Sequence, residues 1–327
     1  MPTDRCAVCG NQFERASKRQ AVCGNTPLCA EVVRASRELG VSQLEYAEAH
    51  RIGSDGRGAV TCAPALSSDV VAQNVPSTHL KFLAWPDTHF PYEDSRAVEL
   101  GLRVVKYYQP NIVFLMGDML DAQGFGSFAY PLSDPKSFLA TELAHWKAFA
   151  SRLREAAPKA DLFYIEGNHE ARLEKWAWRH PQLTGLPEFE LSNLLKLSDY
   201  GFANNGEVLL EATLANGELM FTHGTHTGSN KAGFAARFEM ARYGTSGFSG
   251  HTHRLATYYE RSRSKLRVWH ECGHMQIWQP HYLKFFPNWQ QGLAIGEAAR
   301  DGNDFDAETI PFRLTYKCRV HGRELSA

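Results

Sequence analysis

The chain has 327 residues, of which 43% are hydrophobic and 22% are charged, the composition of an ordinary globular protein. Its 35 lysines and arginines are balanced by 36 aspartates and glutamates, so the global basic surplus of a protein that wraps DNA is absent. No apolar run reaches the roughly 18–20 residues that span a bilayer. Residues 1–15 also lack the apolar segment of a secretory signal. We therefore expect a cytoplasmic protein with no membrane partner.

Four of the seven cysteines lie in the first thirty residues, at Cys6, Cys9, Cys23 and Cys29. A CxxC pair followed by a second pair is typical of a structural zinc site with four thiolate ligands, although the second pair is more widely spaced than usual. The stretch CAVCGNQF also resembles the short zinc ribbons and treble-clef fingers that are often fused to nucleic-acid enzymes. The alternative is four reduced cysteines without a metal, and nucleic-acid binding by this segment stays open.

Changes in composition predict the domain boundaries. Residues 31–50 have helical apolar spacing, whereas residues 53–78 are rich in Gly, Ser, Ala and Pro and have no helical period. We predict a Cys-rich, zinc-finger-like module with following helices over 1–52, a linker over 53–78 and a larger domain over 79–327.

From residue 80 onward, apolar runs alternate with helical stretches. LKFLAWPD, NIVFLMGD and DLFYIEGN are separated by SRAVELGLRVVKYY and SFLATELAHWKAFASRLREAA, which predicts parallel strands joined by right-handed helical crossovers. After about residue 205 the runs are shorter. Asn216-Gly217 lies between two of them and predicts a hairpin. Residues 231–243 (KAGFAARFEMARY) predict a further helix.

Polar clusters end these apolar runs, and in a parallel sheet the carboxyl ends of the strands lie at the same edge. Any one cluster is compatible with a helix cap, a turn or an ordinary core histidine. Five in succession favour a metal centre, and oxygen and imidazole ligands suit Mn, Fe or Zn. The clusters are Asp87-x-His89, Gly117-Asp118-x-x-Asp121, Gly167-Asn168-His169-Glu170, Thr222-His223-Gly224 and Gly250-His251-x-His253.

The ordered motifs DxH, GDxxD, GNHE, His before Gly, and GHxH resemble the calcineurin-like metallophosphoesterase superfamily, from Asp87 to His253. The surrounding sequence, including PNWQQG at 287–292, resembles the phage and prophage branch. The resemblance implies a four-layer α/β/β/α sandwich with two divalent metals between the sheets. It assigns Asp87, His89, Asp118 and His253 to one metal, and Asp118, Asn168, His223 and His251 to the other.

The resemblance also implies roles for residues that do not bind the metals. His169 would be the acid near the leaving oxygen, and Asp121 would steady it. Arg172 either contacts the phosphate or is an ordinary arginine on a helix surface. His226 and His274 lie near the motifs and either line the substrate pocket or are ordinary residues, of which the second interpretation is favoured.

These residues predict hydrolysis of phosphoesters by a metal-bridging hydroxide, with DNA, RNA or nucleotide phosphodiesters as the favoured substrates. The alternative is a phosphomonoesterase acting on small molecules or proteins. Ala122 stands where Ser/Thr phosphatases of this superfamily carry an arginine, which weakens that alternative. A scaffold without turnover is disfavoured because every predicted ligand is present. The metal loaded, the substrate and the oligomeric state are not determined by the sequence.

Overall fold

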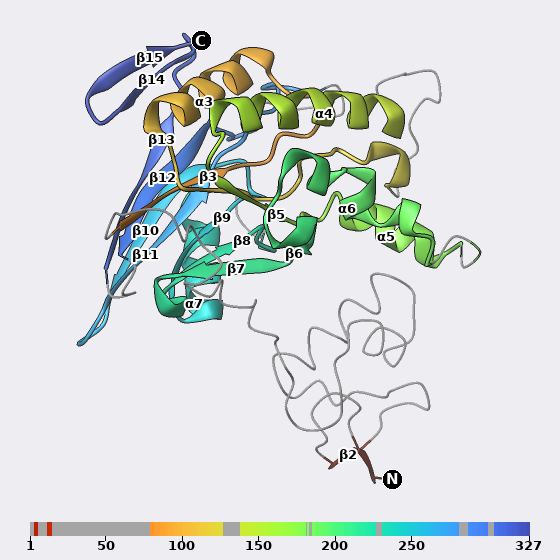
Figure 1. The fold of residues 1–327 in the computed structure, drawn as a ribbon. Helices are drawn as coiled ribbons and strands as arrows, with labels where there is room; N and C mark the ends of the chain where they lie inside the picture. Colours follow the sequence, from red (N-terminus) through yellow and green to blue (C-terminus); the bar gives the residue numbers. More distant parts are fainter. Residues whose placement is uncertain are drawn as a thin grey trace. The chain divides into compact units, whose positions relative to one another are not determined.

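The computed structural model describes residues 3–5, 12–14, 79–126, 138–180, 182, 185–226, 231–280, 287–299 and 304–327 (Figure 1). Strands β1 (Thr3–Arg5) and β2 (Gln12–Glu14) pair antiparallel. The four N-terminal cysteines and the predicted linker lie outside the described residues, so the zinc module and the domain boundaries stay predictions. No helix among the described residues is long and apolar enough to cross a membrane.

The first sheet has six strands in the order β13-β12-β3-β4-β5-β6. Strands β3 to β6 are parallel, and β12 and β13 add antiparallel at one edge. Helix α3 (Ser95–Tyr108) joins β3 to β4, and α4 (Leu139–Ala156) joins β4 to β5, which confirms the predicted crossovers. The strands are β3 (His79–Trp85), β4 (Ile112–Leu115), β5 (Asp161–Ile165), β6 (Val208–Leu209), β12 (Gly292–Ala299) and β13 (Phe305–Pro311).

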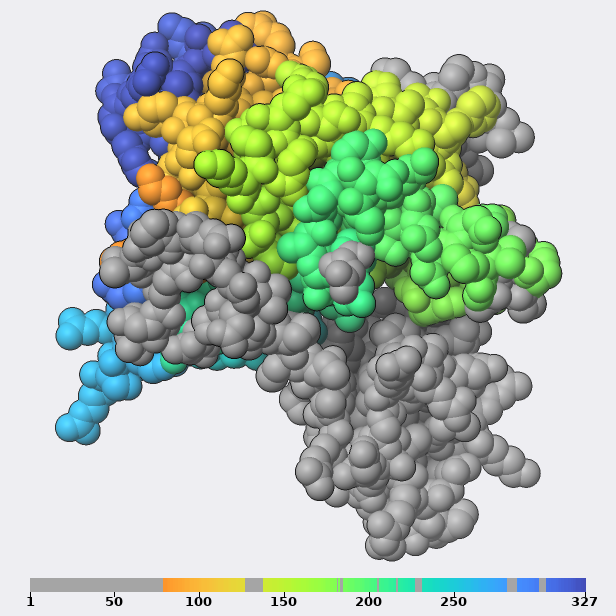
Figure 2. Space-filling model, in the orientation of Figure 1, coloured from red at the N-terminus to blue at the C-terminus, as the bar shows by residue number. Residues whose placement is uncertain are grey.

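The second sheet has five strands in the order β10-β11-β9-β8-β7. The β7–β8 pair turns at Ala215–Gly217, so the predicted hairpin is confirmed. Helix α7 (Phe234–Tyr243) is the predicted helix after it. The β10–β11 hairpin, light blue in Figure 2, projects from the edge of this sheet. The strands are β7 (Glu211–Leu214), β8 (Leu219–Thr222), β9 (Ser246–Ser249), β10 (Leu255–Arg261) and β11 (Leu266–Cys272).

Shorter elements complete the described chain. Helix α5 (Ala171–Trp178) and the single-turn α6 (Leu191–Leu194) lie between β5 and β6. The hairpin of β14 (Lys317–Val320) and β15 (Arg323–Ser326) ends the chain. The 3₁₀ turns are η1 (Gln123–Phe125), η3 (Pro187–Phe189), η4 (Leu197–Tyr200), η5 (Asn204–Gly206) and η6 (Ala215–Gly217).

Three apolar cores separate four layers. Successive residues of a strand face opposite sides of a sheet, so Trp85 packs under α3 and α4 while Phe82 points to the second sheet. There Phe82 meets Phe221 and Phe248, with ring centroids 5.3 Å apart in both pairs. A third core lies between α7 and the five-stranded sheet. Helices therefore cover both outer faces of two packed sheets (Figure 1), and the predicted α/β/β/α sandwich is confirmed.

Candidate metal centre

The predicted ligands from the two sheets meet at one place. Two groups of side chains each bring their ligand atoms within 4.8 Å of one another, and a third, formed by His89, Asp118 and His169, connects them. The residues come from loops that follow the carboxyl ends of β3, β4, β5, β8 and β9. The first group is Asp87, His89 and His253; the second is Asp118, His223 and His251.

In the first group, nitrogen and oxygen atoms converge without enough protons to share. Nδ1 of His89 lies 3.0 Å from Oδ1 of Asp121, and because an ionised carboxylate only accepts, His89 donates through Nδ1. The lone pair on Nε2 of His89 therefore points at Nε2 of His253, 2.9 Å away. Nε2 of His253 also lies 3.1 Å from Oδ2 of the fully buried Asp87.

The second group has the same character. Nδ1 of His223 donates to the carbonyl oxygen of Met116 at 2.8 Å, so its Nε2 faces the centre and can hold either a proton or a metal. That atom faces Oδ2 of Asp118 at 3.3 Å, Oδ1 of Asn168 at 3.0 Å and Nδ1 of His251 at 3.2 Å. Ligand atoms that converge on one point beside a buried carboxylate favour positive charge there, carried by a proton or by a metal cation.

The titration of His223 supports this interpretation. Burial alone would lower its pKa, but the nearby Asp118 and Asp87 carboxylates outweigh burial and raise the pKa to about 10. By contrast, burial and the neighbouring His223 lower the pKa of His251 to about 4. Without a metal, the imidazole of His223 is therefore protonated, as expected for a site that stabilises positive charge.

Asp118 stands between the two groups. Its carboxylate is 2% exposed, and Oδ2 lies 3.8 Å from Nε2 of His89 and 3.3 Å from Nε2 of His223. Burial would raise its pKa, but the surrounding imidazoles hold the pKa well below the ordinary value of 3.8. This is the position that the predicted bridging ligand requires.

His169 lies at the edge of the centre, with 16% of its side chain exposed. Its Nδ1 donates to the backbone oxygen of Asp121 at 2.7 Å and lies 3.5 Å from the carboxylate of the same residue. The closest imidazole to that carboxylate is therefore His89, a pairing that the sequence did not indicate. Burial lowers the pKa of His169, but Asp118 and Asp121 outweigh it, and the pKa lies above 6.5.

Arg172 packs against His169. One guanidinium nitrogen donates to the backbone oxygen of Asp121 at 3.0 Å, and the other lies 2.9 Å from Nε2 of His169. Arg172 therefore lies half-buried on α5 at the edge of the centre, and phosphate contact stays a prediction. Because Arg172 donates to Nε2, protonation of that atom requires the guanidinium to move aside.

The loops of the centre are conformationally strained. His89, Asp118, His251 and His253 have φ angles of 55°, 49°, 66° and 58°, in the left-handed region that non-glycine residues rarely occupy. Such strain costs on the order of 1–3 kcal/mol per residue and is typical of functional sites.

Two motif glycines permit the close approach of these loops. A Cβ on Gly167 would lie 2.2 Å from the backbone nitrogen of Asp118, and one on Gly250 would lie 2.2 Å from Oδ1 of Asp87. Any side chain at either position would therefore displace a predicted ligand.

Glu170 has a structural role that the sequence interpretation missed. Its carboxylate is 1% exposed and accepts hydrogen bonds from the backbone nitrogens of Asp118 and Leu120, both at 2.9 Å. It also accepts from the nitrogen of Gly167 at 3.1 Å and from the hydroxyl of Tyr164 at 2.8 Å. Glu170 thus ties the loop after β4 to the loop after β5, and the only signal for it was its place in GNHE.

Two further buried glutamates hold the histidine loops of the five-stranded sheet. Glu271 accepts from the hydroxyl of Thr252 at 2.7 Å and from the nitrogens that begin α7, Gly233 at 2.8 Å and Ala236 at 3.2 Å. Thr252 lies between His251 and His253 in the chain. No motif in the sequence indicated Glu271.

Glu239, on α7, accepts from the nitrogens of Thr225 at 2.8 Å and His226 at 3.2 Å. It thereby holds the loop that follows His223, and it too was missed because its partners lie thirteen or more residues away.

The other two histidines near the motifs have different surroundings. His274 is fully buried and stacks on His253 at a centroid distance of 5.3 Å. Burial, together with neighbouring His253, keeps its pKa well below 6.5, so it is neutral. The ring of His226 lies flat on Phe238 at 3.9 Å.

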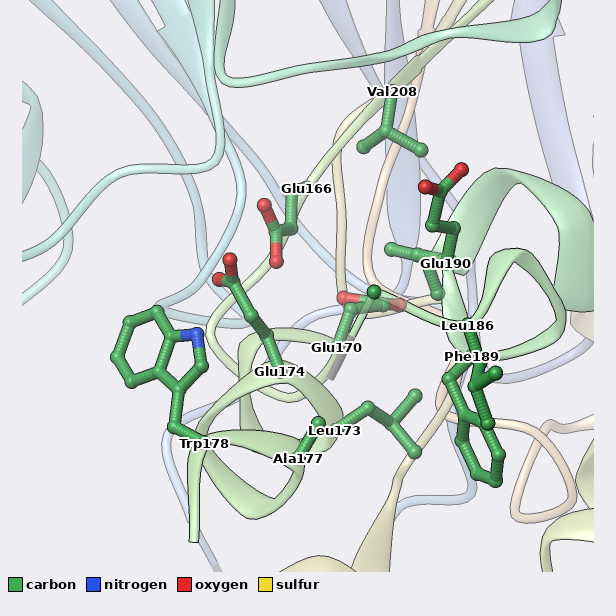
Figure 3. Close-up of a pocket in the computed structure, with 12 residues that line it drawn as sticks. Glu166, Glu170, Leu173, Glu174, Ala177, Trp178, Leu186, Phe189, Glu190 and Val208 are labelled. Atoms are coloured by element: carbon green, nitrogen blue, oxygen red, sulfur yellow. The ribbon is translucent and has the colours of Figure 1, made fainter. Parts of the chain in front are cut away.

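A pocket of about 300 Å³ adjoins the loop after β5 (Figure 3). Four glutamates contribute to its wall together with apolar side chains such as Leu173 and Leu186. Burial raises the pKa of Glu166 to about 8, and the carboxylate of Glu170 accepts the hydrogen bonds from Asp118 and Leu120, so the exposed acidic groups of the wall are Glu174 and Glu190. The glutamates are Glu166, Glu170, Glu174 and Glu190.

Known proteins provide a distant comparison. The chain is 26% identical over 260 residues to the Gene 54 protein of Mycobacterium phage D29, covering 69% of this chain and 91% of that protein. The Gene 54 protein of Mycobacterium phage L5 is 26% identical over 253 residues, with the same coverage. Both relatives are phage proteins, in keeping with the predicted resemblance to phage sequences.

Among solved structures, Vacuolar Protein Sorting 29 from Cryptosporidium parvum aligns with a TM-score of 0.41 and 14% identity, covering 76% of this chain and 99% of that one. This score is too low to support an argument, so the fold assignment rests on the layers described above. No protein-family model matches the chain.

Proposed function

We propose that this chain is a two-metal phosphoesterase of the calcineurin-like superfamily that hydrolyses phosphodiester bonds of nucleic acid or nucleotides. The observation that carries the proposal is the pair of imidazole contacts, His89 to His253 at 2.9 Å and His223 to His251 at 3.2 Å, on either side of Asp118. The same imidazoles turn ring nitrogens toward the buried carboxylates, His253 toward Asp87 at 3.1 Å and His223 toward Asp118 at 3.3 Å, so a cation at each position would have several donor atoms around it. Imidazole and carboxylate donors suit Mn, Fe or Zn.

Different residues of the centre have different roles in such a reaction. Two divalent cations, when bound, neutralise the phosphoryl oxygens and acidify water. Asp118 contributes negative charge to both positions, and Asn168 offers a neutral oxygen beside His223. His169, at the solvent edge with a raised pKa, donates a proton to the leaving oxygen. General acid catalysis of this kind contributes about 10²–10⁴-fold.

Ala122 favours phosphodiesters over phosphoproteins. The resemblance places the arginine of Ser/Thr phosphatases at this position, where the chain has a fully buried alanine with a φ of 44°. Its backbone nitrogen donates to Glu142 at 2.8 Å, which anchors the turn inside the protein. A phosphate-binding side chain is therefore missing at the point where a monoesterase of that type would need one.

A matched activity panel with Mn²⁺ tests the proposal. The substrates are bis-p-nitrophenyl phosphate, p-nitrophenyl phosphate, and single- and double-stranded DNA and RNA. We expect diester cleavage that falls by more than about 100-fold in Asp118→Asn and in His169→Ala. Asp199→Asn, at an exposed site on η4, serves as the control and keeps full activity.

Other outcomes of the panel would favour different functions. Turnover of the monoester alone would favour the phosphomonoesterase. Two bound metals without any turnover would favour a binding protein.

The N-terminal zinc is part of the proposal and is tested separately. We expect one further zinc per full-length chain by elemental analysis, and its loss when Cys6 and Cys9 are both replaced by serine. An unchanged zinc content in that variant would remove the module from the proposal.

A further inference from the structure

Helix α7 has an exposed face whose chemistry the metal centre does not explain. Ala236 and Met240 pack on the five-stranded sheet, and the opposite side of the helix is open to solvent. Phe234 and Phe238 lie on that open side, 42% and 45% exposed, one helical turn apart. Two exposed phenylalanines in succession on one helix face are unusual for a surface that only meets water.

Arginines flank the two phenylalanines. At 100° per residue, Arg237 lies on one side of the aromatic pair and Arg242 on the other. The only acid of α7, Glu239, is 1% exposed and bonded inside the protein. We call this set of Phe234, Arg237, Phe238 and Arg242 the α7 face; it is aromatic at the centre and cationic at both edges.

The α7 face is connected to the metal centre. The ring of His226 lies on Phe238 at 3.9 Å with an interplanar angle of 16°, and it follows the predicted ligand His223 by three residues. Arg242 donates to the hydroxyl of Thr225 at 2.7 Å. An aromatic ridge therefore begins beside the second metal group and continues along the helix.

The sequence segment that contains α7 and the two strands after β9 differs in charge from the chain as a whole. Residues 231–271 contain eight lysines and arginines against three glutamates, in a chain of net charge −1. Two of those glutamates, Glu239 and Glu271, are buried and hydrogen-bonded. The exposed charged side chains of α7 are both arginines, which attract a polyanion.

We propose that the α7 face binds single-stranded nucleic acid and leads it to the metal centre, an inference that rests on the proposed function. Arginines attract the phosphates, and exposed aromatic rings stack on bases. Only unpaired bases offer a free face for stacking, because the bases of a duplex stack on one another. The aromatic ridge therefore selects single strands, and the two arginines alone would not.

Binding can be measured separately from catalysis. Fluorescence anisotropy of a labelled 20-nucleotide oligo-dT is followed in EDTA over a series of salt concentrations, using the full chain. We expect Phe234→Ala and Phe238→Ala each to weaken binding about tenfold. Arg237→Glu should weaken binding and reduce its dependence on salt. Phe138→Ala, a 49% exposed phenylalanine beside α4 in the opposite outer layer, is the matched control and should change nothing.

The remaining readouts separate this inference from the proposed function. Turnover of bis-p-nitrophenyl phosphate should stay within twofold of the parent in all four variants, while KM for oligo-dT rises in the α7 variants. Oligo-dT binding that is unchanged in both phenylalanine variants overturns the inference. The inference is also overturned if duplex DNA or polyglutamate binds as tightly as oligo-dT and only Arg237→Glu weakens that binding. If the parent hydrolyses no phosphoester, the proposed function fails while the anisotropy still decides the role of α7.

Discussion

The two sheets contribute differently to the metal centre. Loops of the six-stranded sheet supply all of its carboxylates and its amide, at Asp87, Asp118 and Asn168, whereas loops of the five-stranded sheet supply only imidazoles. The negative charge that a divalent cation needs thus comes from one half, and neutral donors come from the other. Neither half is a complete ligand set, so the packing of Phe82 on Phe221 and Phe248 between the sheets determines how the candidate ligands meet.

Each half also has its own buried glutamate. Glu170 bonds directly to the backbone nitrogen of Asp118, while Glu271 reaches the histidine loop through Thr252 and the start of α7. The comparison teaches that in the carboxylate half a buried glutamate bonds the backbone of the ligand itself. In the imidazole half, the buried glutamate bonds Thr252, which is the chain neighbour of two ligands and not a ligand itself.

The largest expected effect is at the contact between the halves. Gly250→Ala places a Cβ 2.2 Å from Oδ1 of Asp87, so the loop of one sheet pushes the ligand of the other. We expect loss of bound metal, a fall in diester turnover of more than about 100-fold and destabilisation of about 1–3 kcal/mol. Metal content and chemical denaturation provide the measurements.

Gly126→Ala, whose Cβ would meet its nearest atom at 3.3 Å, is the control for this substitution. A Gly250→Ala protein with two metals and full turnover would show that the two halves are not in rigid contact.

Removing the glutamates one at a time sharpens the comparison. We expect Glu170→Gln to lower Mn²⁺ affinity by about 10–100-fold, because an amide cannot accept all the bonds that this carboxylate accepts. Glu271 is one residue further from the ligands, so Glu271→Gln should lower Mn²⁺ affinity by about tenfold or less. Glu190→Gln, in the wall of the pocket next to Glu170 (Figure 3), should leave affinity unchanged. Calorimetric titration measures all three, and equal losses at Glu170 and Glu271 would contradict the difference between the halves.

Metal removal tests whether the centre joins the sheets. A cation that binds only the folded chain stabilises it by about 2.7 kcal/mol at a concentration 100 times its Kd. We expect EDTA to lower the melting temperature of the parent protein. EDTA should lower the melting temperature of the Asp118→Asn variant by less, since the centre of this variant binds metal poorly. Equal shifts in the two proteins would assign the stabilisation to metal bound elsewhere.

The last prediction concerns stability alone and a carboxyl outside the ligand set, beneath the six-stranded half. Burial of Glu142 raises its pKa from 4.5 to about 8, despite its bond from Ala122. The folded chain therefore keeps a proton that the unfolded chain releases between these values. Stability should fall as pH rises through this window, by up to about 1.4 kcal/mol per pH unit. Thermal melting from pH 5 to 8 should show a flatter profile for Glu142→Gln.

Glu155→Gln, an exposed glutamate on the same helix α4, is the control and should retain the parent profile. A Glu142→Gln profile as steep as that of the parent would place the titrating group elsewhere.

Much of this arrangement followed from the sequence alone. The alternation of apolar runs and helical stretches predicted the parallel strands β3, β4 and β5, and the polar residues after them were expected at one edge. That inference is local, because the period of a strand and the direction of a parallel crossover depend on neighbouring residues. The ordered motifs carried the rest of the ligand set through their resemblance to a known family.

Only the tertiary structure decided which side chains meet. His89 and His253 are 164 residues apart in the chain, and the carboxylate of Asp121 lies closer to His89 than to His169. The roles of Glu170, Glu239 and Glu271, and the continuity of His226 with α7, likewise depend on how two sheets and a helix pack. Sequence spacing determines the face on which a side chain lies, and the burial of the apolar surface between the layers determines what that face contacts.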